Sequence, residues 1–195
     1  MITKIQLNRV RRDLQFLEEC IAGRPHSQKL LYEHFAPKMF GICLRYASDF
    51  HQAEDILQEG FIKVFHNLHR FRKEGSFEGW MKRIFINTAI EFYRKAANSY
   101  ALPLAEEVLT TNCSGKALSD LRHQDLLKVI QQLPDGYRTV FNLYAIEGYH
   151  HKEIGQLLNI SEGTSKSQLA RARKVLKALI QQQEDEIKSG SVVAP

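Results

Sequence analysis

Apolar residues recur every three or four positions through two long stretches of the chain, residues 1–96 and 121–182. This spacing is typical of amphipathic α-helices, and no stretch shows the sustained alternation, bounded by turn residues, that predicts a β-strand. The sequence therefore predicts an all-α protein without strands. With 195 residues, 44% apolar and 25% charged, the chain is long and apolar enough for one domain or two small ones, and global disorder is excluded.

Turn residues and the periodicity together predict the limits of the helices. The expected helices span residues 12–22, 26–48, 52–70, 77–96, 121–133, 136–147, 151–158 and 162–182. Pro37 interrupts the second of these and is expected to kink it, because proline removes a backbone donor and clashes with the preceding turn.

The charges divide the chain at the same places as the helical pattern. Residues 1–96 hold 16 Lys and Arg against 11 Asp and Glu, residues 121–182 hold 9 against 5, and the segment between them holds 1 against 3. That segment, 97–120, is rich in Asn, Ser and Thr, which is the composition of a linker. We therefore expect two small helical domains, an N-terminal helical bundle (1–96) and a C-terminal domain (121–182), joined by a flexible linker (97–120) and followed by a flexible tail (183–195).

Composition also limits the chemistry. The formal net charge of +5 and the pI near 9.1 favour an anionic partner. Cys20, Cys43 and Cys113 are odd in number and far apart, so the sequence predicts no disulfide framework and no metal site. Without an apolar run long enough to span a bilayer, we expect a cytoplasmic protein with no direct membrane insertion. No nucleophile, carboxylate pair or phosphate-binding Gly loop is evident, so we predict no enzymatic activity and no cofactor.

The C-terminal stretch has the pattern of a helix-turn-helix. A short helix (151–158) and a tight turn are followed by a long helix (162–182), for which Ser161 is a good N-cap. The apolar side of the long helix is expected to pack inward, and its other side combines small and cationic residues. A helix that enters the major groove of DNA needs small side chains in its first turns and side chains that donate hydrogen bonds to base edges. The expected DNA contacts are Lys166 and Arg171 on base edges, with Arg173, Lys174 and Lys177 on phosphates. A basic surface helix that is merely solvated is the alternative, which the preceding turn disfavours.

The helix that begins near Glu54 has two different sides. Its core stripe is Leu57, Phe61, Val64, Phe65 and Leu68. The opposite side carries Asp55, Gln58, Glu59, Ile62 and His66. An acidic patch around an exposed Ile62 indicates a protein-docking surface. A single exposed apolar residue is also common in monomers, so the pattern alone leaves both interpretations open.

The loop at residues 71–77 and the helix after it combine aromatic rings with cations. Side chains of these kinds stack on, bond to and neutralise single-stranded DNA. The candidates are Phe71, Phe77, Trp80, Arg83, Asn87, Arg94 and Lys95. Packing in the core is the alternative for the aromatic residues, and for Trp80 it is the favoured one.

Three segments in this order resemble the extracytoplasmic-function branch of bacterial RNA polymerase sigma factors, which belong to the sigma-70 family. Asp55–Phe65 is similar to the region-two segment that binds the polymerase clamp helices, and Phe77–Ala89 with Arg94 and Lys95 to the helix that engages the minus-ten element. Leu133–Pro134 and Gly163–Arg173 resemble region four, whose second helix reads the minus-thirty-five element.

The resemblance implies a transcription initiation factor that binds core RNA polymerase, recognises two promoter elements and promotes DNA melting. Asp55, Gln58, Glu59 and Ile62 would dock on the polymerase. Lys73, Gly75, Ser76 and Asn87 would line a pocket for a flipped base, and Lys166, Ser167, Ala170 and Arg171 would face the upstream element. The resemblance also implies an inhibitory anti-sigma partner. Ala170 is smaller and Gln168 different from the residues of some relatives, so the upstream consensus does not transfer.

Two other classes of protein remain possible from the sequence. A helix-turn-helix regulator would use the N-terminal helices to sense a ligand or to dimerise. A nucleic-acid-modifying enzyme would need a metal or acid–base cluster, for which His66 and His69 are weak support.

Overall fold

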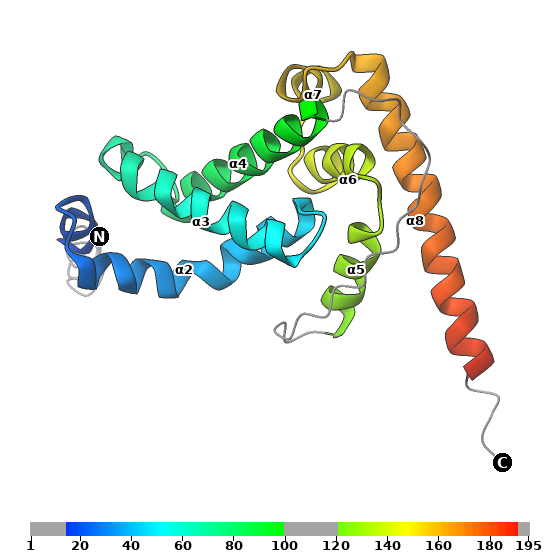
Figure 1. Cartoon of the computed structure of the whole chain (residues 1–195), viewed down its shortest axis with the longest axis horizontal. Helices are drawn as coiled ribbons and strands as arrows, with labels where there is room; N and C mark the ends of the chain where they lie inside the picture. The colour runs from blue at the N-terminus through cyan, green and yellow to red at the C-terminus, as the bar shows by residue number, and fades with distance from the viewer. Residues whose placement is uncertain (1–14, 100–120, 191–195) are drawn as a thin grey trace, which may run out of the picture. The chain divides into compact units, whose positions relative to one another are not determined.

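The structure is a computed structural model that describes residues 15–99 and 121–190 (Figure 1). Within these ranges every regular element is helical, in agreement with the predicted fold class. The helices fall into two parts along the chain, one on each side of residues 100–120. Most of the predicted linker and the last residues of the predicted tail lie outside the described residues.

The first helical part follows the predicted pattern closely. Residues 15–21 are helical, and three long helices follow: α2 (Pro25–Tyr46), α3 (Phe50–Asn67) and α4 (Phe77–Ser99). A short 3-10 turn, η1 (Leu68–Arg70), extends α3 to the predicted end at residue 70. Pro37 lies inside α2, which continues through it as one helix.

The second helical part differs from the prediction at two places. It contains α5 (Leu121–Gln131), α6 (Asp135–Phe141), the π-helical turn η2 (Asn142–Ile146), α7 (His151–Leu158) and α8 (Glu162–Gly190). The helix predicted at residues 136–147 is therefore divided into an α-helix and a π-helical turn. Helix α8 continues beyond its predicted end at residue 182 to Gly190.

The chain forms two compact units whose limits fall inside the long helices. The first unit contains residues up to Cys43 together with Glu54–Thr88, and the second contains Leu44–Ala53 and the chain from Ala89 onward. The domain limits predicted from the sequence, 1–96 and 121–182, stay a prediction.

The core of the first unit is built where α3 meets α4. Met39, Ile56, Val64 and Phe85 are almost completely buried. Gly60 lies directly against the ring of Phe85, so closely that a Cβ atom at this position would come within 2.3 Å of the ring atom Cε1. A residue larger than glycine would therefore force the Phe85 ring or the helices that carry the two residues to shift.

The second unit has a core of its own, which α8 shares with α5. Val129, Ile130, Leu133, Ala172 and Leu176 form a buried cluster. Arg138 of α6 is buried beside it, only 2% exposed, and its Nη1 donates to the carbonyl oxygens of Gln131 and Leu133 at 3.0 Å. The carbonyls at the end of a helix have no partner within the helix. Arg138 supplies donors to them, and its Nε also donates to the carbonyl of Tyr46 at 3.2 Å.

Candidate protein and nucleic-acid interfaces

The outer side of α3 carries the four residues predicted to contact the polymerase. Ile62 is 62% exposed, Asp55 and Gln58 are exposed, and Glu59 is half-buried. Glu59 lies 3.7 Å from the Nζ of Lys63, one turn along the same helix. The core side of α3 agrees with the predicted stripe, because Leu57, Phe61, Val64 and Leu68 are buried, while the fifth member, Phe65, is half-buried. The helix therefore presents an acidic surface around one large apolar side chain.

The loop between η1 and α4 is exposed over residues 72–76. Lys73 has a φ of 60°, a left-handed conformation that is uncommon outside glycine. Ser76 ends the loop and caps α4, because its Oγ accepts from the amide of Gly79 at 3.3 Å. The cap fixes the place where the loop becomes helix, while the side chains of Lys73 and Ser76 stay exposed.

Aromatic rings gather at the base of this loop. The ring centroids of Phe71 and Phe77 are 5.1 Å apart, and those of Phe77 and Trp80 are 5.6 Å apart in a nearly parallel stack. Phe35 of α2 adds a fourth ring, 5.6 Å from Phe77. All four side chains are half-buried, so Trp80 belongs to a packed cluster that keeps part of its surface accessible.

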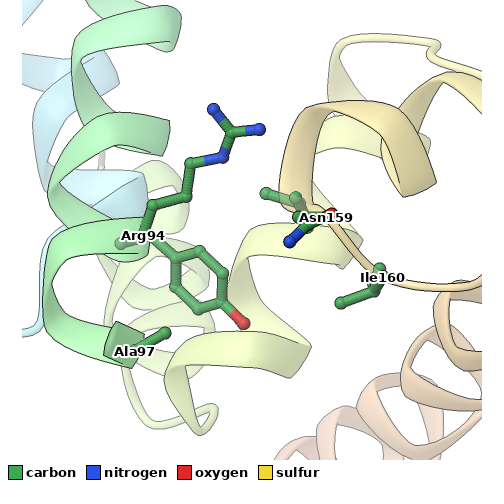
Figure 2. Close-up of a pocket in the computed structure, with 6 residues that line it drawn as sticks. Arg94, Ala97, Asn159 and Ile160 are labelled. Carbon is green, nitrogen blue, oxygen red and sulfur yellow. The ribbon is translucent and has the colours of Figure 1, made fainter. Parts of the chain in front are cut away.

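The polar candidates on α4 are divided between the two units. Arg83 and Asn87 are exposed one turn apart in the first unit. Arg94 and Lys95 are exposed in the second, where the Nη2 of Arg94 donates to the carbonyl of Gln156 at 3.3 Å and Lys95 lies over the ring of Phe92. Figure 2 shows Arg94 and Ala97 facing Asn159 and Ile160 across an open pocket of this unit.

The helix-turn-helix is present, with the predicted turn. Helix α7 ends at Asn159, whose φ of 55° and ψ of 47° place it in the left-handed region. Ser161 caps α8 as predicted, because its Oγ accepts from the amide of Thr164 at 2.9 Å. The left-handed conformation of Asn159 is a common way to end a helix, because asparagine and glycine adopt it more readily than other residues.

Helix α8 presents a small and cationic surface on the side away from its core. Ser165, Leu169, Ala172 and Leu176 are buried. The exposed positions include Lys166, Ser167, Ala170, Arg171, Arg173, Lys174 and Lys177. Lys166 is not isolated there, since its Nζ lies 2.6 Å from Oε1 of Glu162, and this hydrogen bond is the main reason why the pKa of Glu162 is lowered.

Three aromatic residues beneath α8 take part in this surface and were not among the predicted site residues. The Nη1 of Arg171 donates to the hydroxyl of Tyr137 at 3.3 Å, and Arg173 lies 5.7 Å from the centre of the Tyr144 ring. His151 stacks on Tyr144 at 4.5 Å. A helical pattern shows which side of a helix is exposed, but it does not show which side chains of other helices border that side.

Neither a metal centre nor a membrane span is found in residues 15–99 and 121–190. In the described ranges, no three His, Cys, Asp or Glu residues gather closely enough to hold a metal ion. Over the same residues, no helix is both long and apolar enough to cross a membrane.

Comparison with known proteins identifies the class of these two helical parts. Residues 31–99 match the model of sigma-70 region 2, and residues 123–176 match the model of sigma-70 region 4. Together the two matches define a sigma-70-type transcription initiation factor.

Individual relatives narrow the class. The chain is 33% identical over 159 residues to the ECF RNA polymerase sigma factor SigW of Bacillus subtilis, covering 73% of this chain and 83% of SigW. It is 29% identical to the RNA polymerase sigma-H factor of Pseudomonas aeruginosa, covering 87% and 94% of the two chains. Among solved structures, CnrH in complex with the cytosolic domain of CnrY aligns with a TM-score of 0.44 at 20% identity, over 86% of this chain and 96% of CnrH.

The chain belongs to the extracytoplasmic-function (ECF) sigma factors, with regions 2 and 4. The resemblance seen in the sequence is confirmed, and with it the function in transcription initiation through RNA polymerase and promoter recognition. Sigma factors are not enzymes, as the sequence predicted. Family membership also removes the two alternative classes, the ligand-sensing regulator and the modifying enzyme.

Proposed function

We propose that this ECF sigma factor works through three exposed surfaces, each on a helix whose opposite side is buried. The observation that carries the proposal is that residues predicted to contact the polymerase or DNA are exposed on these helices. Asp55, Gln58 and Ile62 are exposed on α3, Arg83 and Asn87 on α4, and Lys166, Ser167 and Ala170 on α8. A residue on such a side can contact a partner without unfolding its helix.

The outer side of α3 binds core RNA polymerase. Ile62 supplies an exposed apolar anchor, and the carboxylates of Asp55 and Glu59 surround it. Interfaces of this kind gain most of their affinity from a few central apolar or aromatic residues, while the charges around them set the orientation and the rate of encounter. The polymerase surface is therefore expected to have an apolar pocket for Ile62, surrounded by basic residues that face Asp55 and Glu59.

The loop at residues 71–76 and the start of α4 bind the opened minus-ten element. Lys73, Gly75 and Ser76 are exposed beside the aromatic cluster, with Phe77 at its centre, and Arg83 and Asn87 continue the polar surface along α4. Arg94 and Lys95 supply cations further along the same helix. A base stacked on an aromatic ring gains about 1–3 kcal/mol. That gain is comparable with the few kcal/mol needed to extract a base from the duplex.

The exposed side of α8 binds the minus-thirty-five element as duplex. Gly163, Ser167 and Ala170 are small enough to let the helix approach base edges, and Lys166 supplies a donor near its start. Cations further along the helix, including Lys174 and Lys177, contact the phosphates. Because the two DNA-binding regions belong to one chain, binding of the second element is effectively intramolecular.

Run-off transcription with purified core polymerase tests the proposal. Transcription from a promoter that carries both elements is expected to depend on adding this protein. Replacing Arg83 and Asn87 together by Ala is expected to lower open-complex formation while leaving capture of the polymerase unchanged. A protein that is folded and captured by the core but supports no promoter-dependent initiation would contradict the proposal.

We also propose an inhibitory anti-sigma partner that covers one or more of these surfaces. This proposal rests on family membership alone. Its expected signature is a copurifying protein whose removal restores initiation by the core polymerase.

A further inference from the structure

The two arginines near the middle of α8 lie on its flanks rather than on its outermost side. They are neighbours of Ala172, which is fully buried and marks the direction of the core. Successive residues of an α-helix are turned by about 100° from each other. Arg171 and Arg173 therefore point to opposite sides of the helix, and Ala170 and Lys174 lie closest to its outermost line.

Each flanking arginine contacts a tyrosine of the helices beneath. On one flank, the Nη1 of Arg171 donates to the hydroxyl of Tyr137 in α6 at 3.3 Å. On the other flank, the guanidinium of Arg173 lies over the ring of Tyr144 in η2, 5.7 Å from its centre. Both arginines are exposed, and each of these contacts restricts a long side chain at the surface.

The two tyrosines are themselves fixed in the domain. Tyr137 packs against the core cluster that α8 shares with α5. Tyr144 stacks on His151 at 4.5 Å, and the Nδ1 of His151 lies 2.9 Å from the Oγ of the buried Ser165 in α8. The ring under Arg173 is thereby tied to the first turns of the same helix that carries Arg173.

We propose that Tyr137 and Tyr144 are positioning residues, which hold Arg171 and Arg173 ready to bind the phosphates on the two sides of the major groove. The inference rests on the proposed function of α8. A helix that lies in the major groove has a sugar–phosphate strand along each flank, and the planar guanidinium of Arg binds phosphate with two parallel hydrogen bonds. In this arrangement Arg171 contacts the sugar–phosphate backbone of the DNA, in place of the base-edge contact predicted from the sequence.

The first part of the test separates backbone contacts from base contacts. Holoenzyme assembled from core polymerase and the full chain is titrated with promoter duplexes that differ by single base pairs in the upstream element, at several salt concentrations. Arg171→Ala and Arg173→Ala are each expected to weaken binding by the same factor on every duplex and to reduce the slope of log K against log salt by about 0.9. A change in base preference at one position caused by Arg171→Ala would overturn its assignment.

The second part makes the same substitution at both tyrosines and expects different results. Tyr137→Phe removes the hydroxyl that accepts from Arg171 and is expected to weaken binding about two- to fivefold. Tyr144→Phe keeps the ring under Arg173 and is expected to leave binding unchanged, whereas Tyr144→Leu removes the ring and is expected to weaken binding about two- to fivefold. Equal effects of Tyr137→Phe and Tyr144→Phe would overturn the proposal.

Double-substitution cycles distinguish positioning from a general structural role. Tyr137→Phe is expected to have no further effect in an Arg171→Ala protein, and Tyr144→Leu none in an Arg173→Ala protein. A tyrosine that only stabilises the domain would cause the same loss in both backgrounds, which would overturn the proposal. If Tyr144→Leu fails to fold, the Tyr137 cycle still decides. Failure of the wild-type holoenzyme to prefer the upstream element would instead contradict the function proposed for α8, which is a separate result.

Discussion

Glu162 and Lys166 face each other at the start of α8, one turn apart, with 2.6 Å between Oε1 and Nζ. The hydrogen bond and the charge of Lys166 lower the pKa of Glu162 below its ordinary value. The carboxylate therefore stays ionised at neutral pH and is protonated only as the pH falls through this lowered pKa. At neutral pH it neutralises a cation that we expect at the DNA.

Replacing this carboxylate should strengthen DNA binding. Glu162→Gln is expected to tighten the binding of holoenzyme to the upstream element and to steepen the salt dependence by about 0.9 in slope, because Lys166 then neutralises DNA rather than its neighbour. The gain should disappear when Lys166 is also replaced by Gln. Weaker binding by the single variant would show that Glu162 itself contributes to the interface.

Cys20 illustrates how burial controls the chemistry of a single residue. Its side chain is buried, and burial, followed by the nearby charge of Glu19, raises the pKa of its thiol to about 11. Reactive cysteines need the thiolate form. We expect iodoacetamide at pH 8 to label Cys20 slowly in the native protein and quickly after unfolding in urea, as measured by mass spectrometry. Rapid labelling of Cys20 in the native protein would contradict this assignment.

At the scale of elements, the contact between α3 and α4 depends on Gly60. Since a Cβ atom there would come within 2.3 Å of the Phe85 ring, Gly60→Ala is expected to lower the free energy of unfolding by about 1–3 kcal/mol. Gly41 in α2 is the matched control, because a Cβ atom there would meet no neighbouring atom within 4 Å. Gly41→Ala is expected to raise the free energy of unfolding by about 0.5–1 kcal/mol.

Urea unfolding followed by circular dichroism measures both changes. Equal effects of the two substitutions would mean that the two helices adjust to the added methyl group. The sequence assigned no role to Gly60, whose contact with Phe85 depends on how α3 and α4 pack.

The helices were predictable because their apolar spacing is clear. The division of residues 136–147 was not, since an α-helix and a π-helical turn of five residues produce nearly the same pattern. The full length of α8 was missed for a different reason. The ending Ser-Gly-Ser-Val-Val-Ala-Pro is typical of a frayed tail. The Gln, Glu and Lys residues before it favour a helix when a packed helix precedes them, and α8 continues through them.

The site was predictable only one helix at a time. Periodicity shows that Ile62 and Lys166 are exposed, and both are. Two other features depend on how different helices pack and have no signature in the sequence. They are the hydroxyl of Tyr137 beside Arg171 and the burial of Arg138 against the end of α5. The assigned roles at the polymerase and at DNA stay predictions that binding experiments must test.

At the scale of the whole molecule, capture by the polymerase and reading of the promoter should be separable. Reversing two charges on α3 with Asp55→Lys and Glu59→Lys is expected to weaken binding to core polymerase at least tenfold, because like charges would then meet across the interface. The circular dichroism spectrum should be unchanged, since neither carboxylate is buried.

Reversing an exposed charge elsewhere provides the control. Glu33→Lys on α2 is expected to leave polymerase binding intact, because Glu33 is exposed outside the proposed surface. Equal losses for the control and the double variant would indicate a response to net charge. Unchanged affinity of the double variant would remove α3 from the polymerase interface.

Helix α8 runs for 29 residues from the Ser161 cap to Gly190. At 1.5 Å per residue it is a rod of about 43 Å. In the proposed complex the first turns of α8 enter the DNA groove and its distal turns act as a lever, so a small rotation at the groove would become a displacement of several ångströms at the far end. A fluorophore attached near residue 188 would thus report, from a distance, the moment at which the promoter is engaged.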